Sequence, residues 1–188
     1  MVKIAFIDCE GTVRPTPLFY NPLTAFYIAA ARRHEGEVHR CLARLHQAGV
    51  VFVWNTRAPE MTPETPAGRL HSMNGRTIRD ARAEHLAMLK EVGIDESWLL
   101  PGRPEVVHRT SMTKGQAVMA FLAEAGIDVC DTVAFDDSLE EMEGYPHERF
   151  VLVQAERGIT RANVLHAARI LRLPGFGVKA SAGSCAPR

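Results

Sequence analysis

The sequence predicts an α/β sandwich with a mainly parallel β-sheet, and two observations favour this fold class. Short apolar runs alternate along the chain with stretches that repeat apolar residues at helical spacing. Three of the apolar runs end directly in polar or acidic side chains, at Asp8, Asn55 and Asp136. Because parallel sheets bind ligands where their strands end, the fold class also predicts the edge at which a functional site should lie.

The predicted strands are short runs of apolar, mostly β-branched or aromatic residues. Residues 4–7 form an unbroken apolar run, which is typical of a strand covered on both faces. Residues 50–54, 132–135 and 150–153 have the same character, and 98–100 is a shorter candidate. We therefore expect a buried sheet whose first strand is 4–7.

The predicted helices lie between these strands and carry recognisable end signals. Gly49 ends the helix before the second strand, and Thr113 or Ser111 is expected to cap a helix further along. Thr160 is expected to cap the last helix. The expected helices are 23–33, 38–47, 77–92, 115–125 and 160–171.

Length and composition indicate one globular domain. The 188 residues are 46% hydrophobic, so we expect a single domain over 1–172 and a flexible tail over 173–188. Acidic and basic residues number 22 each, so no global charge favours nucleic acid or a membrane surface. The chain enters a strand directly and contains no spanning-length apolar stretch, so we expect a cytoplasmic protein with reduced thiols.

Two carboxylates follow the first predicted strand. If the backbone stays extended from Asp8 to Glu10, a period of two places both side chains on the same side. Gly11 then permits a sharp exit of the chain. Such a pair can bind a cation, act as a nucleophile or transfer a proton, or it can be a pair of solvated acids at a strand end.

Three further charged residues stand in unusual places. Lys114 precedes a predicted helix, where a cation opposes the helix dipole, so it either has a specific role or points into solvent. Asp136 and Asp137 are adjacent at a predicted strand end and repel each other unless a cation or solvent lies between them. If the strand ends meet, these residues can converge with Asp8.

A basic segment follows the second predicted strand. Residues 58–75 show no periodicity and are expected to form a long loop or a small insertion. The arginines in or just after it form either a solvated face or a clamp for an anionic substrate, and the sequence leaves both open. They are Arg69, Arg76, Arg79 and Arg82.

Taken together, these motifs resemble the haloacid dehalogenase (HAD) superfamily of phosphatases and phosphotransferases over residues 2–171. The segment D-C-E-G-T-V is similar to the first motif of that family, and the strand that ends at Thr56 to the second. Lys114 is similar to the third motif and A-F-D-D to the fourth. The resemblance implies a Rossmann-like three-layer sandwich with a minimal cap domain or none.

The resemblance also implies a Mg²⁺-dependent phosphomonoester hydrolase that works through an aspartyl-phosphate. Asp8 would be the nucleophile, and Glu10 would be the general acid/base in place of the family's usual aspartate. Mg²⁺ would be held by Asp8, the backbone carbonyl of Glu10 and Asp136, with Asp137 nearby.

Phosphate recognition is implied for the residues after the second strand. Thr56 would bind the phosphate, Asn55 could replace it in the other register, and Arg57 follows directly. Lys114 would stabilise both Asp8 and the transferring group.

The substrate remains open at this stage. A site with little or no cap could admit a nucleic-acid end, a phosphoprotein or a glycan, or an oligomer could cover it; the neutral net charge disfavours tight nucleic-acid binding. A phosphotransferase with another acceptor and a non-catalytic phosphate-binding module are the alternative functions.

Overall fold

The computed structural model describes residues 2–9, 11–13, 25–55, 93–106, 108 and 111–176, with the backbone alone for 25–35. Several predictions concern other parts of the chain and lie outside the described residues. They are the loop 58–75, the helix 77–92, the tail residues 177–188, Arg69, Arg76, Arg79 and Arg82.

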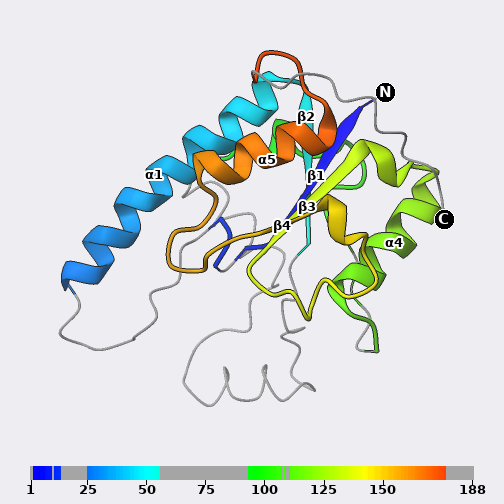
Figure 1. Ribbon diagram of the computed structural model, residues 1–188, viewed down its shortest axis with the longest axis horizontal. Coiled ribbons are helices and arrows are strands. Elements are labelled where there is room, and N and C mark those ends of the chain that lie inside the picture. The colour runs from blue at the N-terminus through cyan, green and yellow to red at the C-terminus, as the bar shows by residue number, and fades with distance from the viewer. Residues whose placement is uncertain are drawn as a thin grey trace.

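Within the described residues, four strands form a parallel sheet in the order β2-β1-β3-β4 (Figure 1). The strands are β1 (Lys3–Ile7), β2 (Val50–Trp54), β3 (Thr132–Asp136) and β4 (Phe150–Leu152). The α/β class and these four predicted strands are therefore confirmed. The central position of β1 and β3 places the residues that follow them in the middle of one sheet edge.

The strand predicted at 98–100 is wrong in part. A 3₁₀ turn, Glu96–Trp98, occupies its start because the Asp95 side chain accepts a hydrogen bond from the Ser97 amide. Of the three residues predicted as a strand, only Leu99 forms a β-bridge, an isolated parallel one to Phe52 of β2.

Three helices are described, and they cover both faces of the sheet (Figure 1). Helices α1 (Ala25–Gln47) and α5 (Arg161–Leu171) pack on one face, and α4 (Lys114–Ala125) packs on the other. The two helices predicted at 23–33 and 38–47 are one continuous α1. No proline separates them, and a single Gly36 costs a helix only about 1 kcal/mol.

The predicted caps of the later helices are confirmed. Thr113 caps α4 in a reciprocal capping box with Gln116, and Thr160 caps α5 in the same way with Asn163. Because the cap fixes the first turn of α4, it also fixes the direction in which Lys114 leaves the backbone.

The alternation of side chains along the strands decides on which face the acidic residues lie. Ile4 and Phe6 of β1 and Ala134 of β3 belong to the buried cluster on the α4 face. With a period of two, Asp8 and Asp136 continue the same rows. Both carboxylates are therefore presented to the face that α4 covers.

The first turn of α4 packs closely on a neighbouring loop through Gly115. The amide of Gly115 donates a 2.9 Å hydrogen bond to the carbonyl of Glu141. A Cβ at this position would lie 2.4 Å from the carbonyl oxygens of Met142 and Glu143, closer than real contacts allow. Because Gly115 has no Cβ, the N-terminal end of α4, which carries Lys114, can lie close to the sheet.

Cys9 and Cys41 are buried and form no disulfide bond, as expected, whereas Cys130 is disulfide-bonded, so the prediction of reduced thiols is wrong for that residue. None of the helices in the described ranges is long and apolar enough to cross a membrane.

We predict opposite effects for alanine at two glycines. Gly115→Ala should lower the free energy of unfolding by about 1–3 kcal/mol, because the new methyl group overlaps two carbonyls. Gly36→Ala, within α1, should raise it by about 0.4–1 kcal/mol, because among the described residues its Cβ would meet only Arg40, at 3.7 Å. Urea denaturation measures both changes; equal stability of the two variants would show that Gly115 is not packed as described.

Candidate functional site

Lys114 bridges two buried carboxylates at the edge of the sheet. Its Nζ lies 2.9 Å from Oδ1 of Asp8 and 2.9 Å from Oδ2 of Asp136. The exposed fractions are 7% for Lys114, 4% for Asp8 and 0% for Asp136. The lysine does not point into solvent, so its unfavourable place in the first helical turn is explained by the two ion pairs.

Backbone hydrogen bonds fix the two carboxylate residues of this group. The amide of Asp8 donates to the carbonyl of Phe135, which ties the end of β1 to β3. Asp136 is the last residue of β3, and its Oδ1 accepts a 2.9 Å hydrogen bond from the amide of Ser138. The group is therefore assembled by strand pairing and a turn before any ligand is present.

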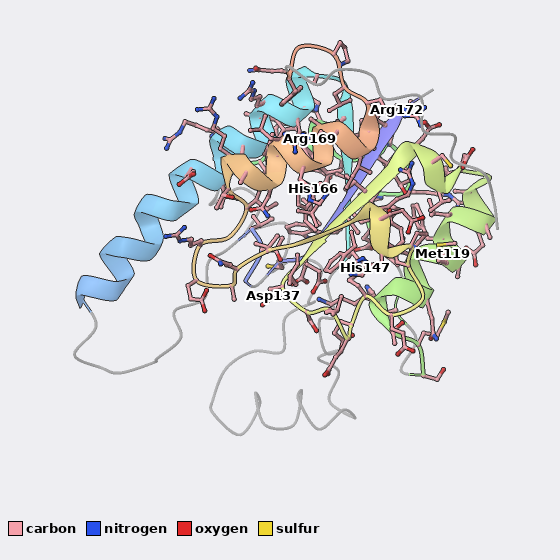
Figure 2. All side chains as sticks on the ribbon, viewed as in Figure 1. Met119, Asp137, His147, His166, Arg169 and Arg172 are labelled. Atoms are coloured by element: carbon pink, nitrogen blue, oxygen red, sulfur yellow. The ribbon has the colours of Figure 1, made fainter. Side chains whose placement is uncertain are left out.

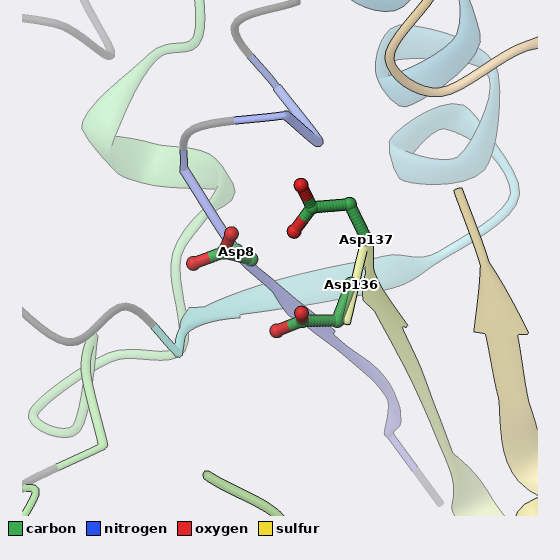
Figure 3. A group of neighbouring side chains, drawn as sticks. All are labelled: Asp8, Asp136 and Asp137. Carbon is green, nitrogen blue, oxygen red and sulfur yellow. The ribbon is translucent and has the colours of Figure 1, made fainter. Parts of the chain in front are cut away.

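Asp137, which is labelled in Figure 2, adds a third carboxylate, and this one is exposed. Ligand oxygens of Asp8, Asp136 and Asp137 all lie within 4.8 Å of one another, and Figure 3 shows them gathered at the ends of β1 and β3. Gly11 passes close by with a φ of +76°, and a Cβ there would lie 2.2 Å from Oδ2 of Asp137. Only glycine fits this approach.

The carboxylates perturb one another. Burial, and then the negative charge of Asp8, raises the pKa of Asp136 to about 6, although Lys114 opposes the change. The pKa of Asp137 is also raised, by burial and by Asp8. Burial alone would lower the pKa of Lys114, but the two carboxylates outweigh it and raise that pKa, so the ammonium stays charged at neutral pH.

The residue types fit a hard divalent cation. Three ionised carboxylates and one ammonium leave the group with a formal charge of −2. The carboxylates offer only oxygen ligands, which suit Mg²⁺ or Ca²⁺ and not a soft metal. The structure thus brings together Asp8, Asp136 and Asp137 of the predicted metal set, while Glu10 lies outside the described residues.

Asn55 and Lys114 are the predicted substrate-binding residues that the structure describes; Thr56 and Arg57 lie outside the described residues. Asn55 is 1% exposed. Its backbone amide donates a hydrogen bond to the carbonyl of Ile7, so Asn55 lies beside the end of β1, next to Asp8. Its Nδ2 lies 3.6 Å from Sδ of Met142, and Oδ1 has no hydrogen-bond partner in the described part of the chain. Whether Asn55 or Thr56 holds a phosphate stays open.

Sequence reasoning missed the role of two residues. Gly115 positions Lys114 by close packing, and a glycine in the first turn of a helix is unfavourable enough to be a signal. Thr12 is fully buried, and its carbonyl accepts from the amide of Ile159, which ties the loop after β1 to the segment before α5. No pattern in the sequence pointed to that contact.

Comparison of the chain with protein-family models, with curated proteins and with solved structures finds no match. The chemistry of the site therefore has to be inferred from its own residues.

We predict that Lys114→Met destabilises the protein strongly and in a pH-dependent way. Removing the ammonium leaves Asp8 and Asp136 facing each other, which should cost about 3–5 kcal/mol at pH 8. At pH 5 the loss should be smaller, because Asp136 has a raised pKa and is protonated there. Denaturant unfolding at the two pH values measures the difference.

A matched control for this variant is Lys3→Met. Lys3 pairs with Asp131, but 30% of its side chain is exposed. Losing this pair should cost less than about 1 kcal/mol at either pH. Similar losses for both lysine variants would contradict the special position of Lys114.

Mg²⁺ is expected to raise the unfolding temperature more at pH 7.5 than at pH 5. The proton on Asp136, with its pKa of about 6, competes with the cation, so affinity should increase as pH rises through that value. Asp136→Asn should abolish the effect, and Asp131→Asn should retain it, because Asp131 pairs with Lys3 away from the site. Equal stabilisation at both pH values would argue against Asp136 as a ligand.

Proposed function

We propose that this protein is a Mg²⁺-dependent phosphomonoester hydrolase that forms an aspartyl-phosphate on Asp8. The observation that carries the proposal is the buried bridge from Lys114 to Asp8 and Asp136, with Asp137 beside it, at the carboxyl edge of a parallel sheet. The four HAD-like motifs are in agreement with it. A HAD-like, Rossmann-like sandwich with little or no cap is part of the same proposal.

Charge balance is the physical reason for this assignment. A phosphate dianion is repelled by a carboxylate nucleophile unless positive charge lies between or beside them. Lys114 contacts Asp8 directly, so one positive charge is already placed next to the attacking group. A cation bound by Asp8 and Asp136 would offset the remaining negative charge of the site and of the substrate.

The nucleophilic step uses the oxygen of Asp8 that does not pair with Lys114. Lys114 pairs with Oδ1, which leaves Oδ2 to attack the phosphorus atom. The bond from phosphorus to the leaving oxygen breaks, and the carboxyl group of Glu10 donates a proton to that oxygen. The products of this step are the free alcohol and the aspartyl-phosphate.

The second step returns the enzyme to its starting state. The carboxylate of Glu10 now takes a proton from a water molecule, whose oxygen attacks the phosphorus atom of the aspartyl-phosphate. The bond between phosphorus and Asp8 breaks, which releases inorganic phosphate and the free carboxylate. Glutamate is one methylene longer than aspartate, with a reference pKa of about 4.3 against 3.9, so it can do the same proton transfer.

We predict that Asp8→Asn lowers the Mg²⁺-dependent hydrolysis of p-nitrophenyl phosphate by about 10³-fold or more, because the amide cannot form the intermediate. Chelation of divalent ions with EDTA should abolish wild-type activity. Addition of Mg²⁺ should restore that activity completely. Asp131→Asn, outside the site, should keep wild-type activity. Undiminished turnover in the Asp8 variant would exclude the covalent mechanism.

The same assay separates the alternative functions. Formation of new phosphate esters when alcohols are added would identify a phosphotransferase. Affinity for phosphate esters without any turnover, at saturating Mg²⁺, would instead identify a binding module and overturn the proposal.

A further inference from the structure

A charged cavity lies between α1 and α5, on the face of the sheet opposite α4 and Lys114. It has a volume of about 250 Å³. The two helices that form it lie side by side in Figure 1 and are in contact. The lining residues are Glu37, Arg40, Cys41, Arg44, Arg161 and Val164.

The floor of this cavity is apolar. Cys41 is 7% exposed and Val164 is 1% exposed. Burial, and then the nearby carboxylate of Glu37, raises the pKa of the Cys41 thiol to about 11. The thiol is therefore protonated at neutral pH and acts as a small apolar group, not as a nucleophile or a metal ligand.

The rim is positively charged. Three arginines and one glutamate line the cavity, and together these residues carry a formal charge of +2 in a chain whose net charge is zero. Among the described residues, no carboxylate lies within ion-pair distance of Arg40, Arg44 or Arg161. Arg44 stacks over the ring of Phe176 at 4.6 Å, which supports its guanidinium from the side.

The start of α5 adds to this positive potential. Arg161 is the first residue of the helix, so the cavity lies at the positive end of the helix dipole. In the capping box of α5, the Thr160 side chain accepts a hydrogen bond from the backbone amide of Asn163. The dipole and the guanidinium groups therefore favour the same kind of ligand.

We propose that this cavity binds a small organic molecule that carries a dianionic phosphoryl group. The group would contact the guanidiniums of Arg40 and Arg161, and the apolar part would rest on Cys41 and Val164. Guanidinium groups pair with phosphoryl oxygens in a bidentate manner, and a charge of +2 matches a dianion better than a carboxylate. The volume is just under the usual range of about 300–1,000 Å³ for small-molecule pockets, so a ligand held inside the cavity has to be small.

This site is independent of the proposed catalytic site. The sheet and its two apolar clusters separate the cavity from Asp8, Asp136 and Lys114. Binding in the cavity needs no divalent cation, because its own side chains supply the positive charge. Failure of either proposal would leave the other standing.

Isothermal titration with phenylphosphonate, which a phosphatase does not cleave, tests the proposal in EDTA-containing buffer. The wild-type protein should bind the probe, and Arg40→Gln and Arg161→Gln should each weaken binding by roughly fivefold or more, because each removes a charged hydrogen-bond donor. Glu37→Gln should tighten it, because it removes a negative charge from the lining of the cavity. The affinity of the wild type should fall as salt is added.

Arg169→Gln is the matched control. Arg169 is also an exposed arginine of α5, but it lies further along the helix and does not line the cavity (Figure 2). Its loss should leave the affinity unchanged. Circular dichroism confirms that each variant is folded; the Glu37→Gln variant keeps the test decisive if an arginine variant does not fold.

Two further ligands test the chemistry of the cavity. Inorganic phosphate lacks the apolar part and benzoate lacks the second negative charge, so both should bind more weakly than phenylphosphonate. The proposal is overturned if the wild type does not bind the probe, or if both arginine variants bind as the wild type does. Binding that is lost in Lys114→Met but retained in the arginine variants would also overturn it, since the probe would then occupy the other site.

Discussion

The pair of contacts from Lys114 to Asp8 and Asp136 is the interaction on which the site depends. Two carboxylates that are almost completely buried at neighbouring strand ends repel each other, and the ammonium between them makes the arrangement tolerable. Buried ion pairs are expensive to desolvate and often contribute no more stability than apolar residues of the same size. A fold gains little from such a group, so the group is better explained by chemistry than by stability.

The rest of the α4 region can be understood as support for that lysine. A cation in the first helical turn is unfavourable by less than about 1 kcal/mol, and this is small beside the attraction of two carboxylates at 2.9 Å. The capping box of Thr113 and Gln116 fixes the helix start, and Gly115 lets it approach the loop that carries Met142. The start of α4 is thus unfavourable as an isolated helix end, and its contacts with the sheet and the neighbouring loop stabilise it.

The sequence predicted the position of the site better than the packing that builds it. The apolar runs and the rule that parallel strands end at one edge of the sheet were enough to predict Asp8 and Asp136 at that edge, and Lys114 was noticed because a cation is unfavourable in the first turn of a helix. The contacts of Gly115 and of Asn55 with Met142 could not be predicted. They join segments far apart in the chain, and they depend on how a helix and a loop settle on the sheet.

The helices show the same limit of prediction from sequence. The pattern predicted a break near Gly36, but one glycine without a proline does not end a helix, and α1 continues through it. The continuity has a consequence that no local pattern contains. It places Glu37, which falls between the two predicted helices, on the same helix as Arg40 and Arg44, and these residues line the cavity together with Arg161 of α5.

The net charge of the chain is zero, but two sites carry local charges of opposite sign. The carboxylate group near Lys114 carries a formal charge of −2, and the cavity between α1 and α5 carries +2. They lie on opposite faces of the sheet, and screening over about 8–10 Å at moderate salt limits their influence on each other. One site therefore needs a cation before an anionic ligand can approach, while the other attracts the anion directly. Net charge excludes a field over the whole molecule, but the ligands of each site are decided by the few side chains that the fold gathers there.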